Sequence, residues 1–424
     1  MRIRQIHIRN FKGIKEATFG FHEQFTVLIG DNATGKTTLL DALAVALGGF
    51  LSGVGQPSRA IRKDEIRTVR HVGQPVPQFP VKVEAWGAIE GFGHDLHWYR
   101  EIKNKSNSEQ GLRSIRKVGK AMLQQARMPQ AESPEARLAL PLLAYFSTAQ
   151  PAENFAIKFK QGEGVEMGYR NCLSARPSAK EFLGWAMALE HNVAKFDRPH
   201  ELALLKAFKD TIVSLLPDQK WTQLAYDMVQ DDLVGVFQDS QGEKMEVAYR
   251  QLSDGYRRVI TFAADLAYRC LQLNPQLGER AIVDTPGVVL IDEIDQHLHP
   301  NWQRRIITDL KRVFPKVQFI ATTHSPFIVQ ELAAEEMINL DHSGPHESPK
   351  DLTLHQVVTD IMSVNGIRSH SFAQRLEAAR QEFAALPKAL TLDDYQRISD
   401  KLGEVLDGEV HDPVYQAFME RTND

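Results

Sequence analysis

The stretch FTVLIGDNATGKTTLLDALAVALGGF, residues 25–50, decides the fold of this chain. FTVLIG is a short apolar run that predicts a buried strand ending at a glycine. GDNATGKTT, residues 30–38, fits the pattern G-x-x-x-x-G-K-[ST]. TTLLDALAVALGGF then has helical periodicity, and Gly48–Gly49 predicts where that helix ends. A buried strand, a glycine-rich loop and a helix in this order are the setting in which such a loop binds phosphate groups.

The residue types of this loop suit a nucleoside triphosphate. Small residues let backbone N–H groups surround the phosphates, and the following helix directs its positive dipole end at them. We expect Lys36 to contact the β- and γ-phosphates and the Thr37 hydroxyl to bind Mg²⁺. An ordinary glycine turn before a helix is the alternative, which the preceding buried strand disfavours. The predicted ATP-binding residues of the loop are Gly30, Asn32, Ala33, Thr34, Gly35, Lys36, Thr37 and Thr38.

Two acids follow another apolar run, in GVVLIDEID at residues 287–295. Ligands of an open α/β sheet bind at the carboxyl ends of its strands, and adjacent acids there are costly without a cation or polar partners. Asp292 is suited to hold Mg²⁺ through water, and Glu293 is suited to polarise the water that attacks ATP. A solvent-facing acid pair is the alternative, and the phosphate loop argues against it.

Two further strand ends carry candidate residues. VQFIATTH, residues 317–324, ends at His324, which is a candidate contact of the γ-phosphate, although a lone histidine is more often structural. LALPLLAYFSTAQ, residues 138–150, ends at Gln150. That glutamine either contacts the metal or a water molecule, or is a solvated loop residue.

The segment QLSDGYRR, residues 251–258, predicts the start of a helix. Ser253 is suited to cap this helix, while its hydroxyl and the Gly255 amide can approach a γ-phosphate. The strands predicted at 288–293 and 317–324, with an amphipathic helix between them, form a βαβ unit and therefore a parallel sheet.

In their order, these motifs resemble the ABC-type ATPase superfamily in its SMC/RecF-like branch. The matching parts are IHIRNFKGI near the N-terminus, GDNATGKTT, LSDGYRR, VVLIDE with the following IDQHLHP, and ATTHSP. The resemblance implies an α/β fold, with ATP and Mg²⁺ as cofactors. In that fold an ATPase head combines a mixed sheet around the phosphate loop with an antiparallel β layer.

The family's organisation predicts four regions of the chain. They are an N-terminal lobe of the head at 1–150, an inserted mainly helical subdomain at 151–245, a C-terminal lobe at 246–344, and a helical docking region at 345–424. We expect residues 51–79, rich in Gly, Pro and Arg, to form a loop.

The resemblance also implies how the LSDGYRR signature is used. In this family the signature completes the ATP site of a second copy, head to tail, so Ser253 and Gly255 are expected to face a partner's nucleotide. Asp295 is expected near the same interface. ATP then holds the dimer together and hydrolysis loosens it. Asp254 departs from the family's common Ser-Gly-Gly form.

Within the branch, several segments are similar to a compact bacterial group that includes the ATPase subunits of Septu-type, PtuA-like anti-phage systems. These segments are FGFHEQFTVLIGDNATGKTTLLDALAVALGGFL, LPLLAYFSTAQ and GYRNCLSARPSAKEFLGWAMALE. The resemblance implies a sensor or scaffold that controls a separate HNH-type nuclease, and for some members a retron RNA–DNA partner. The tail shows no Toprim or HNH nuclease pattern of its own. A RecF-like ATPase of DNA repair or replication is the alternative, and a transporter-type ATPase fits least.

Composition sets the remaining expectations. The chain has 424 residues, a net charge of −4 and two cysteines without metal or disulfide spacing, so we expect a cytoplasmic protein without a membrane partner. Two local clusters are basic, and they fit either nucleic-acid phosphates or a solvated surface. The first cluster contains Arg59, Arg62, Lys63, Arg67 and Arg70, and the second contains Lys103, Lys105, Arg113, Arg116, Lys117 and Lys120.

Overall fold

The computed structural model describes residues 1–72, 74–104, 106–128, 138–147, 164–174, 179–216, 221–227, 232–238, 241–341, 348–364 and 374. Its contacts divide the chain into two units, Met1–Leu354 and His355–Asp424. Gln150, Lys105 and most of the predicted docking region lie outside the described residues. Among the described helices, none has the length and apolar character that crossing a membrane requires.

A five-stranded parallel sheet forms the centre of the first unit. Its order is β15 (Met337–Asn339), β3 (Phe25–Ile29), β14 (Val317–Thr322), β13 (Gly287–Ile291) and β9 (Leu142–Phe146). Every residue of β3, β13, β14 and β9 is buried, as expected for parallel strands covered on both faces. The predicted parallel α/β core is therefore confirmed. The short edge strand β15 was not predicted.

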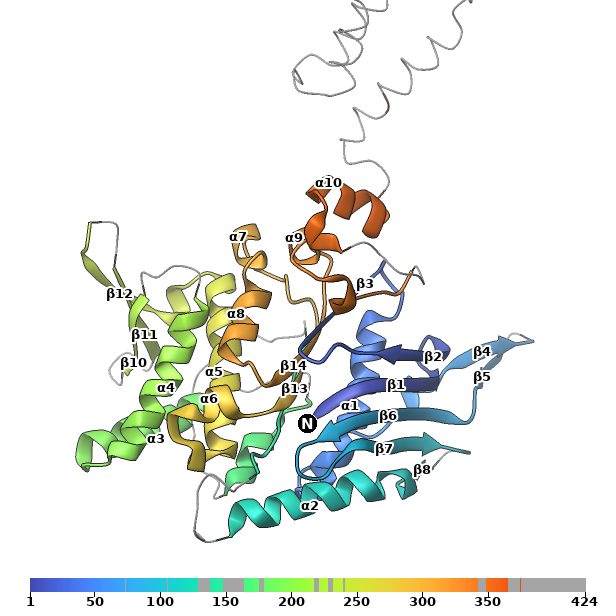
Figure 1. Ribbon diagram of the computed structural model, residues 1–424, viewed down its shortest axis with the longest axis horizontal. Helices are drawn as coiled ribbons and strands as arrows, with labels where there is room; N and C mark the ends of the chain where they lie inside the picture. The colour runs from blue at the N-terminus through green and yellow to red at the C-terminus, as the bar shows by residue number, and fades with distance from the viewer. Residues whose placement is uncertain are drawn as a thin grey trace, which may run out of the picture. The chain divides into compact units, whose positions relative to one another are not determined.

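An antiparallel sheet lies on the other side of the phosphate-loop helix. Its order is β2 (Ile14–Gly20), β1 (Arg2–Phe11), β6 (Val81–Ile89), β7 (Gly93–Ile102) and β8 (Asn107–Ser108). Residues of β6 alternate between buried and half-buried, so one face of this sheet packs on the core. Helix α1 (Lys36–Gly53) contacts strands of both sheets (Figure 1). The combination of the two sheets confirms the predicted ATPase-head architecture.

Helix α1 continues beyond Gly48–Gly49, so the predicted end of this helix was wrong. A Cβ atom at Gly48 would lie 2.7 Å from the Arg59 nitrogen, and one at Gly53 would lie 2.4 Å from the Arg116 carbonyl oxygen. These glycines let the following loop and helix α2 (Arg113–Arg127) approach α1 closely. They are therefore packing residues inside the helix rather than a stop signal.

Three long helices and a small sheet form the end of the unit opposite the antiparallel sheet (Figure 1). The helices are α3 (Ala179–Lys195), α4 (Pro199–Leu215) and α5 (Asp254–Leu273), and the strands are β10 (Trp221–Asp227), β11 (Asp232–Gln238) and β12 (Lys244–Ala248). Trp185 of α3 packs edge-on against Tyr268 of α5, with ring centroids 5.7 Å apart. The three strands pair antiparallel in the order β10–β11–β12.

The remaining elements are short. They are α6 (Ala281–Asp284), α7 (Pro300–Gln303), α8 (Ile306–Val313), α9 (Pro326–Val329), α10 (Leu354–Gln356), the 3₁₀ helices η1 (Lys63–Glu65), η2 (Gln110–Leu112), η4 (Val165–Tyr169), η5 (Tyr249–Gln251), η6 (Pro275–Arg280), η7 (Ala334–Glu336) and η8 (Pro349–Asp351), and the π-helix η9 (Val357–Ile361). The helix predicted between β13 and β14 is interrupted between α7 and α8. Residues 51–79, predicted as a loop, contain a hairpin of β4 (Thr68–His71) and β5 (Gln74–Pro77), so that prediction was wrong there.

Candidate functional site

The predicted site residues gather at one edge of the parallel sheet. The phosphate loop follows β3, Asp292 follows β13, His324 comes two residues after β14, and Asp341 comes two residues after β15. Because all these strands run in parallel, their carboxyl ends meet at this edge. The edge brings together four segments that are far apart in the sequence.

The phosphate loop has the backbone geometry of an anion-binding turn. Gly30, Ala33 and Gly35 have φ values of 144°, 70° and 105°, a region that glycine adopts without steric cost. Residues 31–33 are exposed at the surface of the loop. The Thr34 hydroxyl donates to the Asp31 carbonyl at 3.0 Å, which helps to close the turn.

Lys36 is buried beneath this loop. Its Nζ lies 2.7 Å from the carbonyl oxygens of both Gly30 and Asp31. Burial lowers the Lys36 pKa, while the neighbouring acids, led by Asp341 and Asp31, oppose that shift. The ammonium group therefore lies within its own loop, beside the place where phosphate oxygens are expected.

Thr37 and Asp292 form an oxygen pair suited to a hard cation. The Thr37 hydroxyl lies 3.1 and 3.2 Å from the two carboxylate oxygens of Asp292, which is buried. The Thr322 hydroxyl also donates to Asp292 at 2.7 Å and fixes the carboxylate. Hydroxyl and carboxylate oxygens are ligands that Mg²⁺ prefers, so these two side chains fit the predicted cation.

Glu293 occupies a left-handed backbone conformation, with φ of 51°. Such a conformation costs about 1–3 kcal/mol outside glycine and persists only where the surroundings impose it. Its N–H donates to the Thr322 hydroxyl at 2.7 Å, and its carbonyl accepts from the Arg258 guanidinium at 3.0 Å. Arg258 also donates to the Asp292 carbonyl at 3.3 Å and to the Gln296 side chain. These contacts direct the turn that carries the predicted general base.

Arg258 is a site residue that the sequence analysis missed. It belongs to the signature segment and lies on α5, one turn after the helix begins. Burial lowers its pKa, while the attraction of Asp295, Glu293 and Asp292 acts in the opposite direction. Its place as the second arginine of LSDGYRR could have marked it as a candidate. A sequence pattern does not show, however, which carbonyls an arginine will bind.

Asp295 binds the end of the neighbouring strand within its own chain. Its carboxylate accepts from the Thr323 hydroxyl at 2.6 Å and from the His324 N–H at 3.4 Å. His324 itself is exposed at this edge of the sheet. Asp295 therefore fixes the backbone that presents His324, and its predicted position near a dimer interface stays a prediction.

The signature begins helix α5 as predicted, with Ser253 in the N-cap position. The Ser253 side chain makes no capping hydrogen bond, so that part of the prediction was wrong, and both Ser253 and Asp254 are exposed. Gly255 is buried, and a Cβ atom there would lie 2.5 Å from the His297 carbonyl oxygen. The glycine thus has a packing role against the segment that follows Asp295.

Asp341 was also missed, and it lies directly beside the phosphate loop. Its carboxylate accepts from the Asp31 N–H at 2.6 Å and would lie 3.0 Å from a Cβ atom at Gly30. A negative charge at a phosphate-loop amide competes with an incoming anion for the same hydrogen-bond donor. The short strand that positions Asp341 left no recognisable pattern in the sequence.

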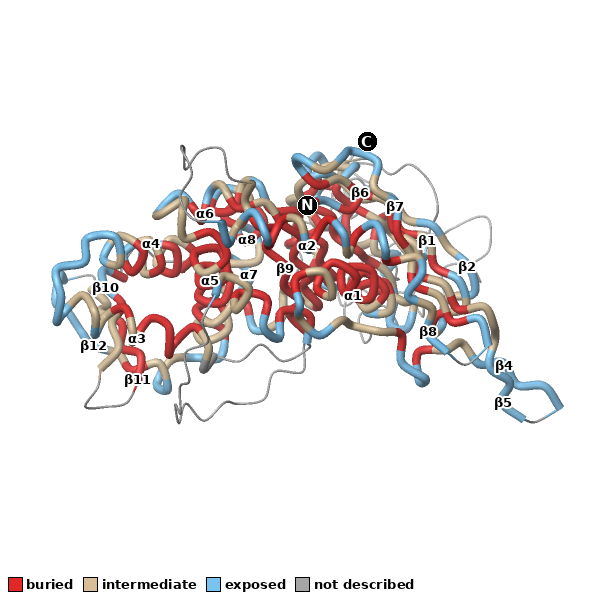
Figure 2. Tube along the Cα trace, turned by 90° about the horizontal axis from the view of Figure 1, so that it is seen from below, coloured by how far each residue is buried: buried red, intermediate tan, exposed pale blue. Residues whose placement is uncertain are grey.

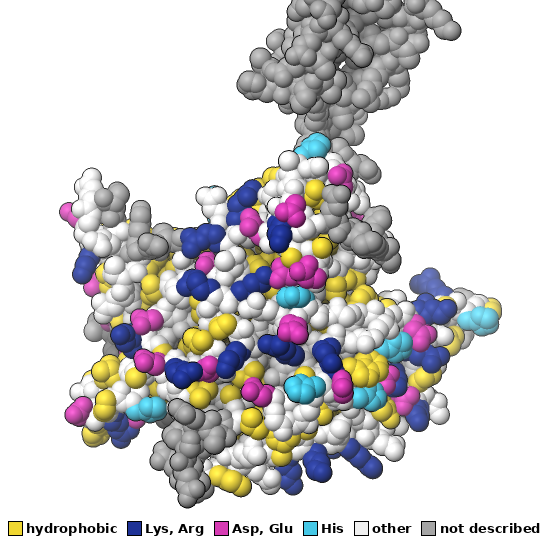
Figure 3. Space-filling model, in the orientation of Figure 1, with side chains coloured by type: hydrophobic (Ala, Val, Ile, Leu, Met, Phe, Trp, Pro, Cys, Tyr) yellow, Lys and Arg dark blue, Asp and Glu magenta, His cyan; other side chains and the backbone are white. Residues whose placement is uncertain are grey.

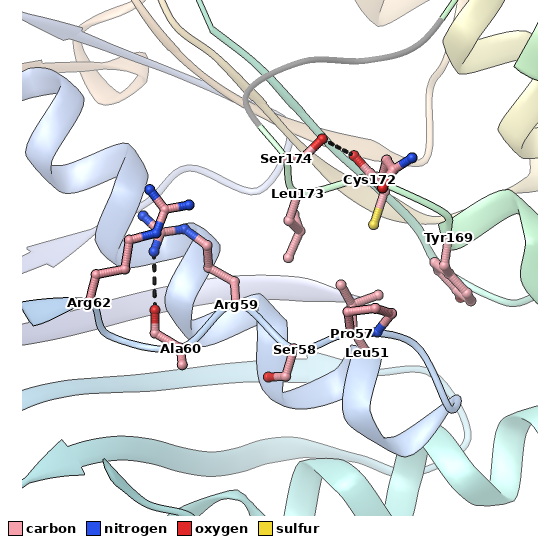
Figure 4. A pocket seen from close by; sticks show the side chains of 11 residues that line it. Leu51, Pro57, Ser58, Arg59, Ala60, Arg62, Tyr169, Cys172, Leu173 and Ser174 are labelled. Carbon is pink, nitrogen blue, oxygen red and sulfur yellow. Dashed lines mark hydrogen bonds between the residues drawn. The ribbon is translucent and has the colours of Figure 1, made fainter. Parts of the chain in front are cut away.

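A separate pocket of about 390 Å³ lies away from these residues (Figure 4). It is lined by the segment after α1, including Arg59 and Arg62, and by the segment around Cys172. Arg59 is paired with Asp41 and Glu65, so its charge is compensated within the chain. Burial raises the pKa of the Cys172 thiol to about 12, which leaves it protonated and unreactive near neutral pH. None of the predicted ATP-binding residues lines this pocket.

Two family models match the chain. One, described as an AAA domain, matches residues 5–210, and the other, described as an AAA domain, putative AbiEii toxin, Type IV TA system, matches residues 174–330. Among curated proteins, the retron Vc95 probable ATPase of Vibrio cholerae serotype O1 biovar El Tor is 25% identical over 80% of this chain and 73% of that protein. By these matches the chain is an ATPase, and it is similar to the SMC/RecF-like ABC type. Its fold and the motifs at the sheet edge agree with this assignment.

Two further relatives refine the position of this ATPase within the branch. The Septu protein PtuA of Bacillus mycoides (strain KBAB4) is 27% identical over 82% of this chain and 41% of that protein. The DNA replication and repair protein RecF of Desulforamulus reducens is 43% identical, but over only 12% of this chain and 13% of that protein. The predicted similarity to PtuA-like ATPases is confirmed by the longer match.

Proposed function

We propose that this ATPase binds ATP between two copies arranged head to tail, and that the ATP-bound dimer controls a separate effector nuclease in anti-phage defence. The observation that carries the proposal is the exposed signature start. Ser253 and Asp254 are exposed, and the Ser253 side chain makes no capping bond, whereas Gly255 packs closely against the His297 carbonyl and Arg258 donates to the Glu293 carbonyl. The outward face of that helix start is available for a partner's γ-phosphate.

Within one copy, each predicted residue has a distinct task. Lys36 leaves the Gly30 and Asp31 carbonyls and donates to phosphate oxygens, which carry more negative charge. Thr37 and Asp292 hold Mg²⁺, which neutralises charge on the phosphates when it is bound. Glu293 orients and deprotonates the attacking water, and His324 contacts the γ-phosphate.

The defence role is supported by the relatives that the chain matches over most of its length. Retron ATPase and Septu PtuA matches cover about four fifths of the chain, at 80% and 82%, whereas the RecF match covers 12%. We infer that an HNH-type nuclease is the partner and that the complex works in the cytoplasm. A RecF-like role in repair is the second candidate, and the short match supports it less.

The dimer is tested with Glu293→Gln, which keeps the side chain's shape and removes its basicity. With ATP and Mg²⁺, light scattering after gel filtration should show a doubled molar mass for this variant. The double variant Glu293→Gln with Ser253→Arg should keep the molar mass of a single copy. Matching masses with and without ATP for Glu293→Gln would contradict head-to-tail assembly.

The effector is tested by purifying the tagged chain expressed from its native locus. We expect a dedicated nuclease to copurify with the wild-type chain. Recovery of DNA with repair factors, and no dedicated nuclease, would favour the RecF-like role instead. Lys36→Ala is the matched variant that tells whether the association depends on ATP.

A further inference from the structure

The β4–β5 hairpin projects from the end of the antiparallel sheet (Figure 2). Every residue of both strands is exposed, and the exposed fraction of Val72, in the turn, is 90%. The hairpin is anchored at its base, where the Arg67 N–H donates to the Asn10 carbonyl at 2.9 Å. A two-stranded ribbon without a sheet behind it is at best marginally stable on its own. Such a projecting ribbon is therefore suited to a partner rather than to the core.

The charge of this region is one-sided. Residues 66–81 contain Arg67 and Arg70 and no Asp or Glu, although the whole chain has a net charge of −4. Arg62 and Lys63 are exposed at the base of the hairpin, beside the exposed Asp64. Basic side chains gather on the projecting end in Figure 3.

The basic side chains in and beside this hairpin differ from Arg59 because no acidic side chain among the described residues pairs with them. Arg59, the first member of the same basic cluster, is paired with Asp41 and Glu65. Across the part of the chain that the structure describes, no ion pair involves Arg62, Lys63, Arg67 or Arg70. These four cations therefore need no protein bond to be broken before they contact an anion.

The prolines of β5 disfavour a further protein strand as the binding partner of this hairpin. Pro75 pairs with Arg70 and Pro77 pairs with Thr68, and proline has no N–H to donate. Prolines are tolerated in a ribbon where their nitrogens face the outer edge, so that edge of β5 lacks donors for strand addition. A two-stranded β-ribbon does fit a groove of duplex nucleic acid.

We propose that the β4–β5 hairpin is a nucleic-acid-binding arm whose Arg67 and Arg70, supported by Arg62 and Lys63, contact the phosphate backbone. Contacts of this kind are independent of base sequence and weaken steeply with salt. The proposal goes beyond the ATP-dependent dimer, because the arm lies on one copy and needs no nucleotide to be exposed.

The test measures binding of a fluorescent random-sequence DNA duplex to the full chain by anisotropy at several salt concentrations. Arg67→Ala with Arg70→Ala should weaken binding at least about tenfold and reduce the slope of log K against log salt by about 1.8, as for two lost phosphate contacts. Arg70→Glu, at an exposed site, should act in the same direction without disturbing packing.

The control removes two positive charges at the opposite end of the unit, with Lys195→Ala and Arg198→Ala at the turn between α3 and α4. This control should bind the duplex within about twofold of wild type. Equal weakening by hairpin and control variants, or wild-type binding by Arg70→Glu, would overturn the proposal. So would a protein partner that is lost from the hairpin variants while DNA binding is unchanged.

Discussion

The turn after β13 and the start of helix α5 lie beside each other, yet they differ in whether their polar side chains are hydrogen-bonded within the chain. Asp292 and Glu293 are held by Thr322 and Arg258, from two other elements of the same chain. Ser253 and Asp254 are exposed, and the Ser253 hydroxyl makes no capping bond. The first region is fixed before any ligand arrives, whereas the second presents its polar atoms outward. This difference is what the proposed head-to-tail dimer requires, and the following variants test it.

The largest effect is expected from Lys36→Ala. Removing the ammonium deletes charge-assisted hydrogen bonds worth about 1.5–3 kcal/mol each, so ATP should bind at least about a hundredfold more weakly. Titration with a fluorescent ATP analogue measures this, with Lys350→Ala as a control at an exposed lysine. ATP affinity like that of the wild type would remove the phosphate loop from the site.

Glu293→Gln should separate binding from chemistry. General-base catalysis contributes about 10²–10⁴-fold, so turnover should fall by at least about a hundredfold while the Kd for ATP stays within a few-fold. Phosphate release and nucleotide titration are measured on the same preparation. If turnover is unchanged, another group activates the water.

Arg258→Lys tests whether the signature helix positions the strand-end turn. Lysine keeps the charge but not the planar fork, so we expect kcat to fall about tenfold with little change in KM, and faster amide exchange at Glu293–Gln296. The neighbouring Arg257→Lys is the matched control, because Arg257 pairs only with Asp254 among the contacts described for its side chain. Amide exchange that is identical in the two variants would leave Arg258 without a positioning role.

The smallest effect is expected from Asp341→Asn. The change keeps an oxygen acceptor for the Asp31 N–H but removes a negative charge beside the phosphates. We expect ATP to bind about two- to fivefold more tightly at low salt, with the gain shrinking as salt screens the charge. Weaker ATP binding would mean that the carboxylate mainly supports the loop.

The sequence predicted best those features whose residues lie close together in the chain. The phosphate loop was predictable because its glycines, Lys36 and Thr37 act through neighbours within nine residues. The pairing of Thr37 with Asp292 also followed, since parallel strands bring their ends together. The end of α1 was predicted wrongly because Gly48 serves a close contact with Arg59, which only tertiary packing reveals.

Other features depend on contacts that sequence patterns do not encode. Thr322 is separated from Asp292 by 30 positions and Asp341 from Asp31 by 310. Each becomes a neighbour only through the strand order β15–β3–β14–β13. The three-residue strand β15 is too short to show a period, so Asp341 could not be placed.

Mixing two inactive variants tests the central claim most directly. Lys36→Ala lacks a working phosphate loop but keeps its signature, and Ser253→Arg lacks a working signature but keeps its phosphate loop. In a head-to-tail dimer of one copy of each, one of the two ATP sites is intact. Labelled with a donor and an acceptor fluorophore, the mixture should show ATP-dependent energy transfer and phosphate release above the sum of the separate variants. Energy transfer and turnover that stay at that sum would contradict a signature acting on a second copy's ATP.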